Sequence, residues 1–351
     1  MNFESRTIDF TTTDRPIVIA EVGVNHNCDI VLAKRMVDQA KACGADVVKF
    51  QAFVAEEEIS RYADKAIYQK ETTGEGGGQL EMAKLLELSH QQLREIKEYC
   101  STVDMPFLCT AFDEPSLYFL VNELKVKAVK VASSEITNHP FLKSIARTGV
   151  GIILSTGASN LHEVEAALKV IKNEGARELV LLHCVSNYPA EKEQLNLNAI
   201  ITMREKFSVP VGYSDHSSGT LAPTVAAALG AVLIEKHFTL DRNMDGPDHR
   251  ASIEPEELKE IVANVASTCL MLGDGVKRCV PCEQDNQALI RKSLVASRAL
   301  NKGQILSIED IKIKRPARGI APNMLNELEG RRLSMDIKQD QPIEWGMLCH
   351  E

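Results

Sequence analysis

The chain has 351 residues, of which 44% are hydrophobic and 25% charged, and these values are ordinary for a globular protein with one large domain and one small one. Its formal net charge of −9 argues against nucleic acid as the main partner, because a protein that binds the phosphate backbone needs a basic face. No run of 18 apolar residues occurs and the first residues lack the apolar core of a signal peptide, so we expect a cytoplasmic protein with no membrane span. The nine cysteines are scattered among apparent core segments, which fits reduced thiols better than a disulfide framework.

Eight short apolar runs, each ending in a polar cluster, recur through the first 240 residues. Each run is too short for a helix of its own, and amphipathic helical stretches separate most of them, such as residues 30–43, 89–100 and 161–173. Strands that alternate with helices predict a parallel sheet, and eight such units predict an α/β fold of the closed (β/α)₈ type, a TIM barrel. The runs are residues 16–21, 46–51, 106–110, 128–133, 151–156, 179–187, 209–216 and 232–237.

The interval after Gln51 is about twice as long as the usual 22 to 30 residues between strand starts. It contains an insertion, residues 56–79, that ends in the flexible run TGEGGGQ. An insertion after a barrel strand lies over the active-site face, so it is either a lid or substrate wall, or a mobile surface loop.

The pattern predicts a helix over residues 255–272 that ends at Gly273, and the pattern changes after it. We expect a catalytic barrel over residues 1–273, a linker over 274–290 and a small β-rich domain over 291–351, because the last segment has short strands, tight turns and no long helix. The linker holds Cys279 and Cys282 at the spacing of zinc and redox sites, but no second pair or nearby histidine completes such a site, and two incidental thiols are the simpler interpretation.

Two histidines end neighbouring strands of the predicted barrel. His216 and His237 are 21 residues apart, at the ends of strands seven and eight, so both rings can reach one point above the barrel. Two neutral imidazoles suit a catalytic divalent ion, although core histidines are commoner. Glu21 ends strand one, which lies beside strand eight once the barrel closes, and is placed to act as an outer ligand or a base.

Two lysines and several hydroxyl groups end other strands. Lys49 and Lys130 with Thr110, Ser133, Ser155 and Ser214 suit a phosphate or carboxylate pocket. For any one of them, a snorkelling lysine or a helix-capping serine is an equally good interpretation, but the set together favours an anion site.

Other polar residues near strand ends fit a polyhydroxy ligand, namely Gln51, Glu135, Tyr188 and Asp248. His183 lies within the apolar run LVLLHC and is interpreted as a core histidine, and His26 and His249 lie in loops with no assigned role.

Five segments, in this order, carry a resemblance: AEVGVNHN, DVVKFQAF, SDHSSG, IEKHFTLDRNMDGPDHRASIEP and KRPARGI. They resemble the sialic acid synthase family, which includes N-acetylneuraminate, legionaminate and pseudaminate synthases. The similarity runs from about Ile17 to the C-terminus and includes the antifreeze-like (SAF) domain that family members carry.

The resemblance implies an enzyme that condenses phosphoenolpyruvate with an open-chain N-acetylated mannosamine-type sugar and releases phosphate. His216 and His237 match the ligands of a divalent metal, usually Mn, with Mg or Co as alternatives, and Glu21 matches the acid or base near the sugar aldehyde. The phosphoenolpyruvate site is matched by Lys49, Thr110, Lys130, Ser133, Ser155, Ser186 and Ser214. The sugar site is matched by Gln51, Glu135, Tyr188, Asp248 and Arg315. Arg315 matches an arginine that one subunit lends to its partner, which implies a domain-swapped homodimer.

Some positions depart from the family pattern. Ser134 stands for a usual glycine, Ala111 for proline, and Ala158–Ser159 for Met-Ala. Ser186 replaces a phosphate-contacting asparagine of some members, and Arg318 lies close enough in sequence to Arg315 to share its role.

Two other functions remain open. A Schiff-base aldolase would use Lys49, Lys130 or Lys236 and would leave the histidines idle, whereas a non-catalytic sugar-binding barrel would be expected to have lost the ligands that this chain retains. Within the family, overall motif similarity favours legionaminate or neuraminate over pseudaminate as the product type.

Overall fold

The computed structural model describes residues 1–3, 6–10, 14–74, 76–349, so residue 75 of the insertion and the last two residues of the small domain lie outside it. The chain divides into two compact units, Met1–Gly273 and Asp274–Glu351, which are described separately below.

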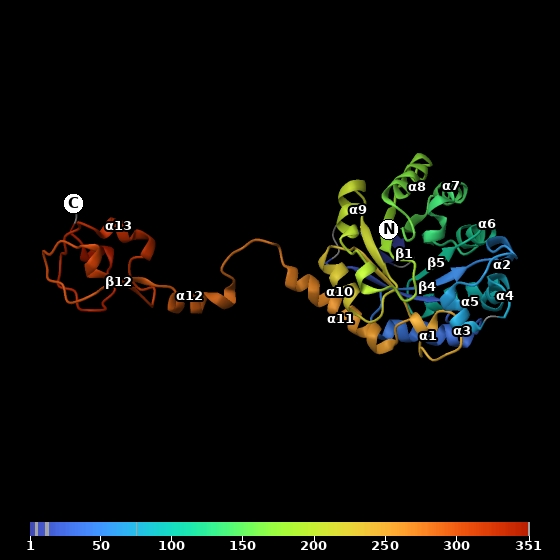
Figure 1. Cartoon of the computed structure of the whole chain (residues 1–351), viewed down its shortest axis with the longest axis horizontal. Helices are drawn as coiled ribbons and strands as arrows, with labels where there is room; N and C mark the ends of the chain where they lie inside the picture. Colours follow the sequence, from blue (N-terminus) through green and yellow to red (C-terminus); the bar gives the residue numbers. More distant parts are fainter. Residues whose placement is uncertain (4–5, 11–13, 75, 350–351) are drawn as a thin grey trace. The chain divides into compact units, whose positions relative to one another are not determined.

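Eight parallel strands close into a barrel in the first unit, as Figure 1 shows, and this confirms the predicted (β/α)₈ fold. Strand β10 pairs with β3, and the order around the barrel is β10-β3-β4-β5-β6-β7-β8-β9. The strands are β3 (Ile17–Gly23), β4 (Val47–Ala52), β5 (Phe107–Ala111), β6 (Ala128–Val131), β7 (Gly151–Ser155), β8 (Leu179–Cys184), β9 (Val211–Asp215) and β10 (Leu233–His237).

Helices surround the barrel and cover its outer face (Figure 1). Several begin where the sequence provides a capping side chain: Asp29, Ser89 and Asn160 each accept backbone N–H groups at the first turn. The outer helices are α1 (Ile30–Ala42), α5 (His90–Thr102), α6 (Glu114–Tyr118), α7 (His139–Arg147), α8 (Leu161–Asn173), α9 (Ala199–Phe207), α10 (Leu221–Ala228) and α11 (Pro255–Leu272).

The barrel interior is layered because alternate residues of each strand point inward. The lower layers are apolar, with side chains such as Ile19, Leu108 and Leu182. A hairpin of β1 (Asn2–Phe3) and β2 (Arg6–Thr7) precedes the barrel, and Phe3 and Ile8 pack into this same apolar cluster. The described side chains that fill the barrel interior at its amino-terminal end are therefore apolar, whereas those at the carboxyl end are polar.

The insertion after β4 folds into short helices, namely α2 (Ala55–Glu58), α3 (Ile67–Thr73) and α4 (Gln79–Leu86). A small separate cluster of Val24, Phe53, Ala55 and Ala83 anchors it to the ends of β3 and β4.

The second unit is a small β-rich module, as predicted. Its sheet pairs β11 (Ser293–Ala296) with β12 (Ile311–Lys314) in antiparallel register, and its core consists of eleven buried apolar side chains such as Leu294, Leu333 and Ile343. The segment expected to be a plain linker contains α12 (Gln284–Ile290), and α13 (Leu325–Leu328) lies within the module.

Candidate active site

The polar layer at the carboxyl end of the barrel encloses a cavity of about 400 Å³, called here the central cavity. Strand alternation explains its lining, because Glu21 lies two residues after Ile19 and Thr110 two residues after Leu108, so the inward side chains change from apolar to polar at this height. Twelve of the predicted site residues line the central cavity: Glu21, Lys49, Gln51, Thr110, Lys130, Ser133, Ser155, Ser186, Tyr188, Ser214, His216 and His237.

Two lysines and two carboxylates form a buried ionic cluster at the floor of the central cavity. Lys49 Nζ lies 2.7 Å from Glu235 and 3.5 Å from Glu21. Lys130 Nζ lies 3.6 Å from Glu235, which also accepts a hydrogen bond of 3.0 Å from Ser214 Oγ. Ser155 Oγ, also buried, has no hydrogen-bond partner among the described residues and is free to bind a ligand.

Sequence reasoning missed Glu235. Its strand ends IEKH, so two adjacent charged residues obscure which of them points inward. The signal was present, because Glu235 is two residues before His237 and must share its face of the strand.

The cluster shifts the pKa values of its two carboxylates in opposite directions. Burial raises the pKa of Glu21, with a further contribution from the charge of Glu235. For Glu235, burial acts in the same direction, but Lys130 and Lys49 outweigh it and lower the pKa. Two carboxylates with pKa values pushed apart are suited to different roles, one as an acid or base and one as a permanent counter-ion.

The lysines also differ. Burial lowers the pKa of Lys130, whereas at Lys49 the two carboxylates outweigh burial and raise the pKa. Lys49 is therefore the more firmly charged of the two.

Glu21 is held close to the two histidines. Gln51 Nε2 donates a 2.9 Å hydrogen bond to Glu21 Oε1, and Glu21 Oε2 has no hydrogen bond within the described residues. The β3–β4 pairing shifts register between Glu21 and Gly23. Gly23 has a φ of +56°, a left-handed conformation that glycine adopts without strain, and a Cβ there would touch Glu21 Oε1 at 3.4 Å and His237 Cε1 at 3.5 Å.

The predicted metal-binding histidines lie together, with ring centroids 5.7 Å apart. His216 Nδ1 donates a 2.8 Å hydrogen bond to the Val185 carbonyl, which leaves the Nε2 lone pair available. His237 Nδ1 is buried, has no hydrogen-bond partner in the described part of the chain, and lies 3.8 Å from Asp248. Burial lowers the pKa of His216 to about 4 and that of His237 well below its usual value, so both rings are neutral at pH 7.

These two rings fit a divalent ion, because each is neutral and has an unused nitrogen. Within the described residues, no group of three or more His, Cys, Asp or Glu side chains is arranged to hold a metal.

A second space of about 230 Å³, the side cavity, adjoins the central cavity and shares Gln51, Phe112, Tyr188 and His237 with it. The insertion builds its wall: Tyr68 of α3 lies with its ring 5.2 Å from that of Tyr188, and Met82 of α4 lines it. The insertion is thus a wall of the site. Asp248 also lines the side cavity, and burial raises its pKa to about 6.

Two predicted site residues lie elsewhere. Glu135 lines neither cavity, and its oxygens accept hydrogen bonds of 2.8 Å from Ser134 and 2.7 Å from Asn138. Arg315 belongs to the second unit, where it directly follows β12 and is exposed. Arg318, three residues later, is exposed as well.

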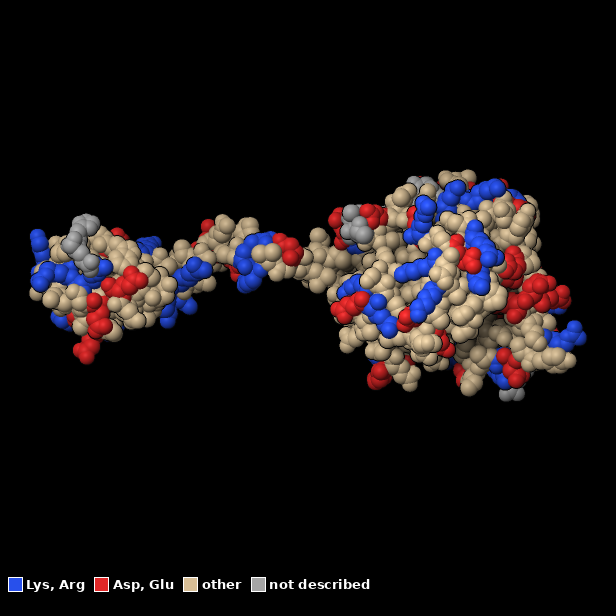
Figure 2. All heavy atoms as spheres, turned by 90° about the horizontal axis from the view of Figure 1, so that it is seen from above, with Lys and Arg blue, Asp and Glu red and all other residues tan. Residues whose placement is uncertain are grey.

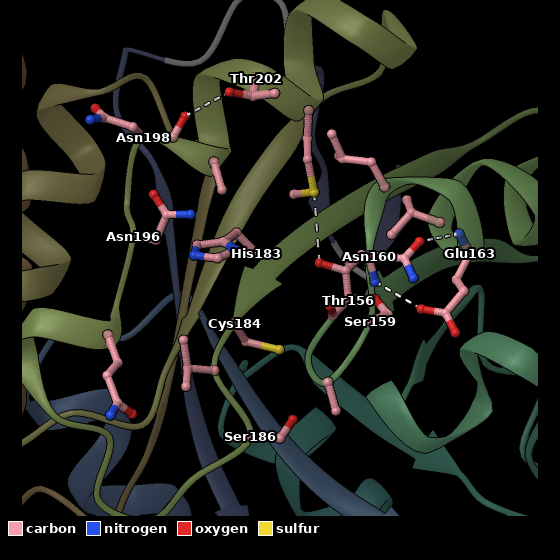
Figure 3. A pocket seen from close by; sticks show the side chains of 17 residues that line it. Thr156, Ser159, Asn160, Glu163, His183, Cys184, Ser186, Asn196, Asn198 and Thr202 are labelled. Atoms are coloured by element: carbon pink, nitrogen blue, oxygen red, sulfur yellow. Dashed lines mark hydrogen bonds between the residues drawn. The ribbon is translucent and has the colours of Figure 1, made fainter.

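Another cavity, of about 780 Å³, lies between the starts of α8 and α9, and Figure 3 shows its lining. Several of its polar side chains are used within the chain: Thr156 donates to the Leu182 carbonyl, Ser159 donates to the Thr156 carbonyl, and Asn160 caps α8. No lysine or arginine is among its lining residues, so it lacks the cationic groups found in the central cavity.

The remaining candidates have ordinary surroundings. His183 is buried and its Nε2 lies 2.7 Å from the Leu195 carbonyl, as expected of a core histidine. Cys279 and Cys282 are exposed free cysteines. On the face shown in Figure 2, basic and acidic side chains are interspersed over the barrel unit. No helix in the described part of the chain is long and apolar enough to cross a membrane.

Comparison with known proteins is consistent across sequence and structure. Residues 36–277 match the NeuB family and residues 291–348 match the SAF domain. The chain is 44% identical over 332 residues to the N,N'-diacetyllegionaminic acid synthase of Legionella pneumophila, covering 93% of both. It is 35% identical over 330 residues to the N-acetylneuraminate-9-phosphate synthase of Homo sapiens, covering 93% of this chain and 90% of the human one.

Among solved structures, the N-acetylneuraminic acid (sialic acid) synthetase of Leptospira borgpetersenii superposes with a TM-score of 0.70 at 36% identity, covering 78% of this chain and 90% of that one. The resemblance inferred from the five sequence segments is confirmed: the chain belongs to the NeuB family and ends in a SAF domain.

Proposed function

We propose that this chain is a nonulosonic acid synthase that condenses phosphoenolpyruvate with 2,4-diacetamido-2,4,6-trideoxymannose and releases phosphate, forming a legionaminate-type acid. The observation that carries the proposal is the buried cluster of two lysines and two carboxylates directly beneath two neutral histidines. The relative named as a legionaminic acid synthase is 44% identical and the one named as a neuraminate-9-phosphate synthase 35% identical, which supports the choice of sugar.

Phosphoenolpyruvate binds at the floor of the central cavity. Its phosphate and carboxylate need cationic partners and hydroxyl donors, and Lys49, Lys130 and the unpartnered Ser155 hydroxyl converge there. Both lysines are partly neutralised by Glu235 in the free enzyme, so binding exchanges one anionic partner for another.

The sugar aldehyde lies above, between Glu21 and the histidines. A divalent ion held by His216 and His237 would polarise the aldehyde oxygen towards attack by C3 of phosphoenolpyruvate. Glu21, with its raised pKa and free Oε2, holds or accepts the proton that the new hydroxyl or the attacking water exchanges. Water then adds at C2, and the resulting tetrahedral intermediate expels phosphate from the lysine-lined floor.

The distal end of the sugar extends into the side cavity. The cavity combines apolar side chains, including Phe53, Met82 and Phe112, with the polar Gln69 and Gln79. A C6 methyl suits the apolar wall and a C4 acetamido group suits neighbouring amides, whereas a C6 hydroxyl would lose hydrogen bonds with water against that wall.

We extend the proposal to a homodimer in which Arg315 of one subunit reaches the sugar in the other. The end of α11 and the first residues of the second unit support self-association, since their large apolar side chains are at least 39% exposed. They are Leu270, Met271, Leu272, Val276, Val280, Leu289 and Ile290.

The test is phosphate release from phosphoenolpyruvate by metal-stripped protein, with and without Mn²⁺. Three sugars are compared: N-acetylmannosamine and the 2,4-diacetamido-trideoxy precursors of legionaminate and pseudaminate. We expect Mn²⁺-dependent release with the legionaminate precursor. Release with another sugar would overturn the substrate assignment alone, and no release with any sugar from folded, metal-loaded protein would overturn the synthase proposal.

A Schiff-base aldolase is favoured by one observation, the lowered pKa of buried Lys130. Lys236 is excluded from the cavity, because it points outward from the barrel and pairs with Asp215. Borohydride trapping of a pyruvate adduct on Lys130, with activity insensitive to chelators, would establish this alternative in place of the synthase.

A further inference from the structure

A buried ion pair lies on the outer face of the barrel, directly behind the two histidines. Asp215 is the last residue of β9 and Lys236 the penultimate residue of β10, and the two are register partners. The Asp215 side chain is 0% exposed and the Lys236 side chain 2% exposed, and neither residue lines the central or the side cavity. The pair is thus sealed beneath the helices and cannot touch a substrate.

Asp215 holds the turn that contains His216. Its Oδ1 accepts hydrogen bonds of 2.8 Å from the Ser217 backbone N–H, 2.7 Å from the Ser217 hydroxyl and 3.0 Å from the Tyr213 hydroxyl. A carboxylate that binds the backbone two residues later closes a tight turn, and here His216 is the middle residue of that turn.

Lys236 completes the attachment from the neighbouring strand. Its ammonium group contacts Asp215 Oδ2 and donates a 2.6 Å hydrogen bond to the Ser217 carbonyl. Both backbone polar groups of Ser217 are therefore held by the ion pair. Because Lys236 directly precedes His237, the same pair connects the backbone beside one histidine to the backbone beside the other.

We propose that the Asp215–Lys236 pair is a positioning element that fixes the spacing of His216 and His237 and so sets the affinity of the site for its divalent ion. The inference rests on the proposed function, since it requires both histidines to bind that ion. Groups that orient metal ligands from behind typically change metal affinity 10- to 100-fold when they are removed.

The test uses the double variant Asp215→Asn/Lys236→Met in the full-length chain, because removing both charges leaves neither of them buried and unpaired. Binding of Mn²⁺ alone is measured by the signal of free Mn²⁺ in electron paramagnetic resonance, and urea unfolding is followed in parallel. We expect the dissociation constant for Mn²⁺ to rise about 10- to 100-fold, with the KM for phosphoenolpyruvate unchanged and kcat partly restored by excess Mn²⁺.

A matched control exists at the opposite end of the barrel. Arg15 pairs with buried Asp46 at 2.7 Å, and Asp46 also accepts the Val18 N–H, far along the strands from the histidines. The variant Arg15→Met/Asp46→Asn should lower stability without changing Mn²⁺ affinity.

The possible results distinguish the positioning role of the ion pair from the assignment of the metal site. A double variant that binds Mn²⁺ within twofold of wild type overturns the positioning role and leaves the proposed function intact. Wild-type protein that binds no Mn²⁺ overturns the metal assignment, and the positioning role with it. A loss of affinity equal in the control variant would show a general stability effect and would also overturn the inference.

Discussion

At the scale of single residues, the central cavity contains an acidic side chain that no simple sequence motif identifies. Glu235 neutralises both lysines at the floor of the central cavity, yet it is adjacent to the outward-facing Lys236. Histidines and lysines at strand ends could be predicted from their chemistry and position, whereas the inward direction of Glu235 follows only from strand register.

The first prediction concerns Glu235→Gln. Removing this charge leaves two buried lysines with only Glu21 as counter-ion, so the free energy of unfolding should fall by about 3 kcal/mol in urea denaturation. Inorganic phosphate supplies the missing negative charge, so it should raise the melting temperature more in the variant than in wild type.

The surface variant Glu123→Gln is the control, because its carboxylate pairs with Arg94 and is 47% exposed. It should change stability by less than about 1 kcal/mol. Equal phosphate stabilisation of wild type and Glu235→Gln would contradict the counter-ion role.

The second prediction concerns acid sensitivity at His26. This ring is 1% exposed, its Nδ1 accepts the Cys28 N–H, and burial lowers its pKa from 6.5 to about 4. A lowered folded-state pKa gives stability that is complete above pH 6.5 and is lost as pH falls towards 4, amounting to about 3 kcal/mol.

Urea denaturation at pH 7.5 and pH 4.5 measures this loss. In His26→Gln the difference between the two pH values should shrink by most of that amount, whereas His162→Gln, at an exposed helix position, should match wild type. An unchanged difference in His26→Gln would refute the assignment.

At the scale of elements, the barrel was predictable because each strand is a compact apolar run buried on both faces. The ends of the strands were harder to predict. The run over residues 179–187 ends in the structure at Cys184, because the sequence does not show whether polar residues after a strand continue its pairing or begin a turn. Helices α3 and α4 were not predicted, because short segments flanked by glycines have little intrinsic signal and form here against the barrel. The side cavity could not be predicted from the sequence, because its walls come from segments that are far apart in the chain.

The third prediction concerns α4, whose Met82 contributes to the apolar wall of the side cavity. Met82→Gln places a polar group where the proposed C6 methyl packs. It should lower kcat/KM for the trideoxy sugar about 10-fold and improve relative use of N-acetylmannosamine. Steady-state kinetics with both sugars provides the measurement.

Leu85 lies on the same helix with 77% of its surface exposed, so Leu85→Gln is the matched control and should leave both sugars unaffected. If Met82→Gln affects both sugars equally, the side cavity does not discriminate at this wall.

At the scale of the whole molecule, the fourth prediction tests whether two chains share a site. His237→Ala and Arg315→Ala should each be nearly inactive alone. If Arg315 acts across the dimer, a heterodimer has one site with both residues intact, so mixing the two under subunit exchange should restore about a quarter of wild-type activity. No recovery, with exchange verified by mass spectrometry, would place Arg315 in its own subunit's site.

The hairpin beneath the barrel has a consequence for the order of events during turnover. Among the described residues, Phe3 and Ile8 pack into the apolar cluster at the lower end of the barrel, so the central cavity is approached from the carboxyl end. The lysines lie one layer deeper than His216, His237 and Gln51, so phosphoenolpyruvate must arrive before the sugar that covers it. Phosphate, formed at the bottom, must leave after the sugar acid. A dead-end sugar analogue should therefore inhibit uncompetitively against phosphoenolpyruvate, and noncompetitive inhibition would mean that the sugar also binds when phosphoenolpyruvate is absent.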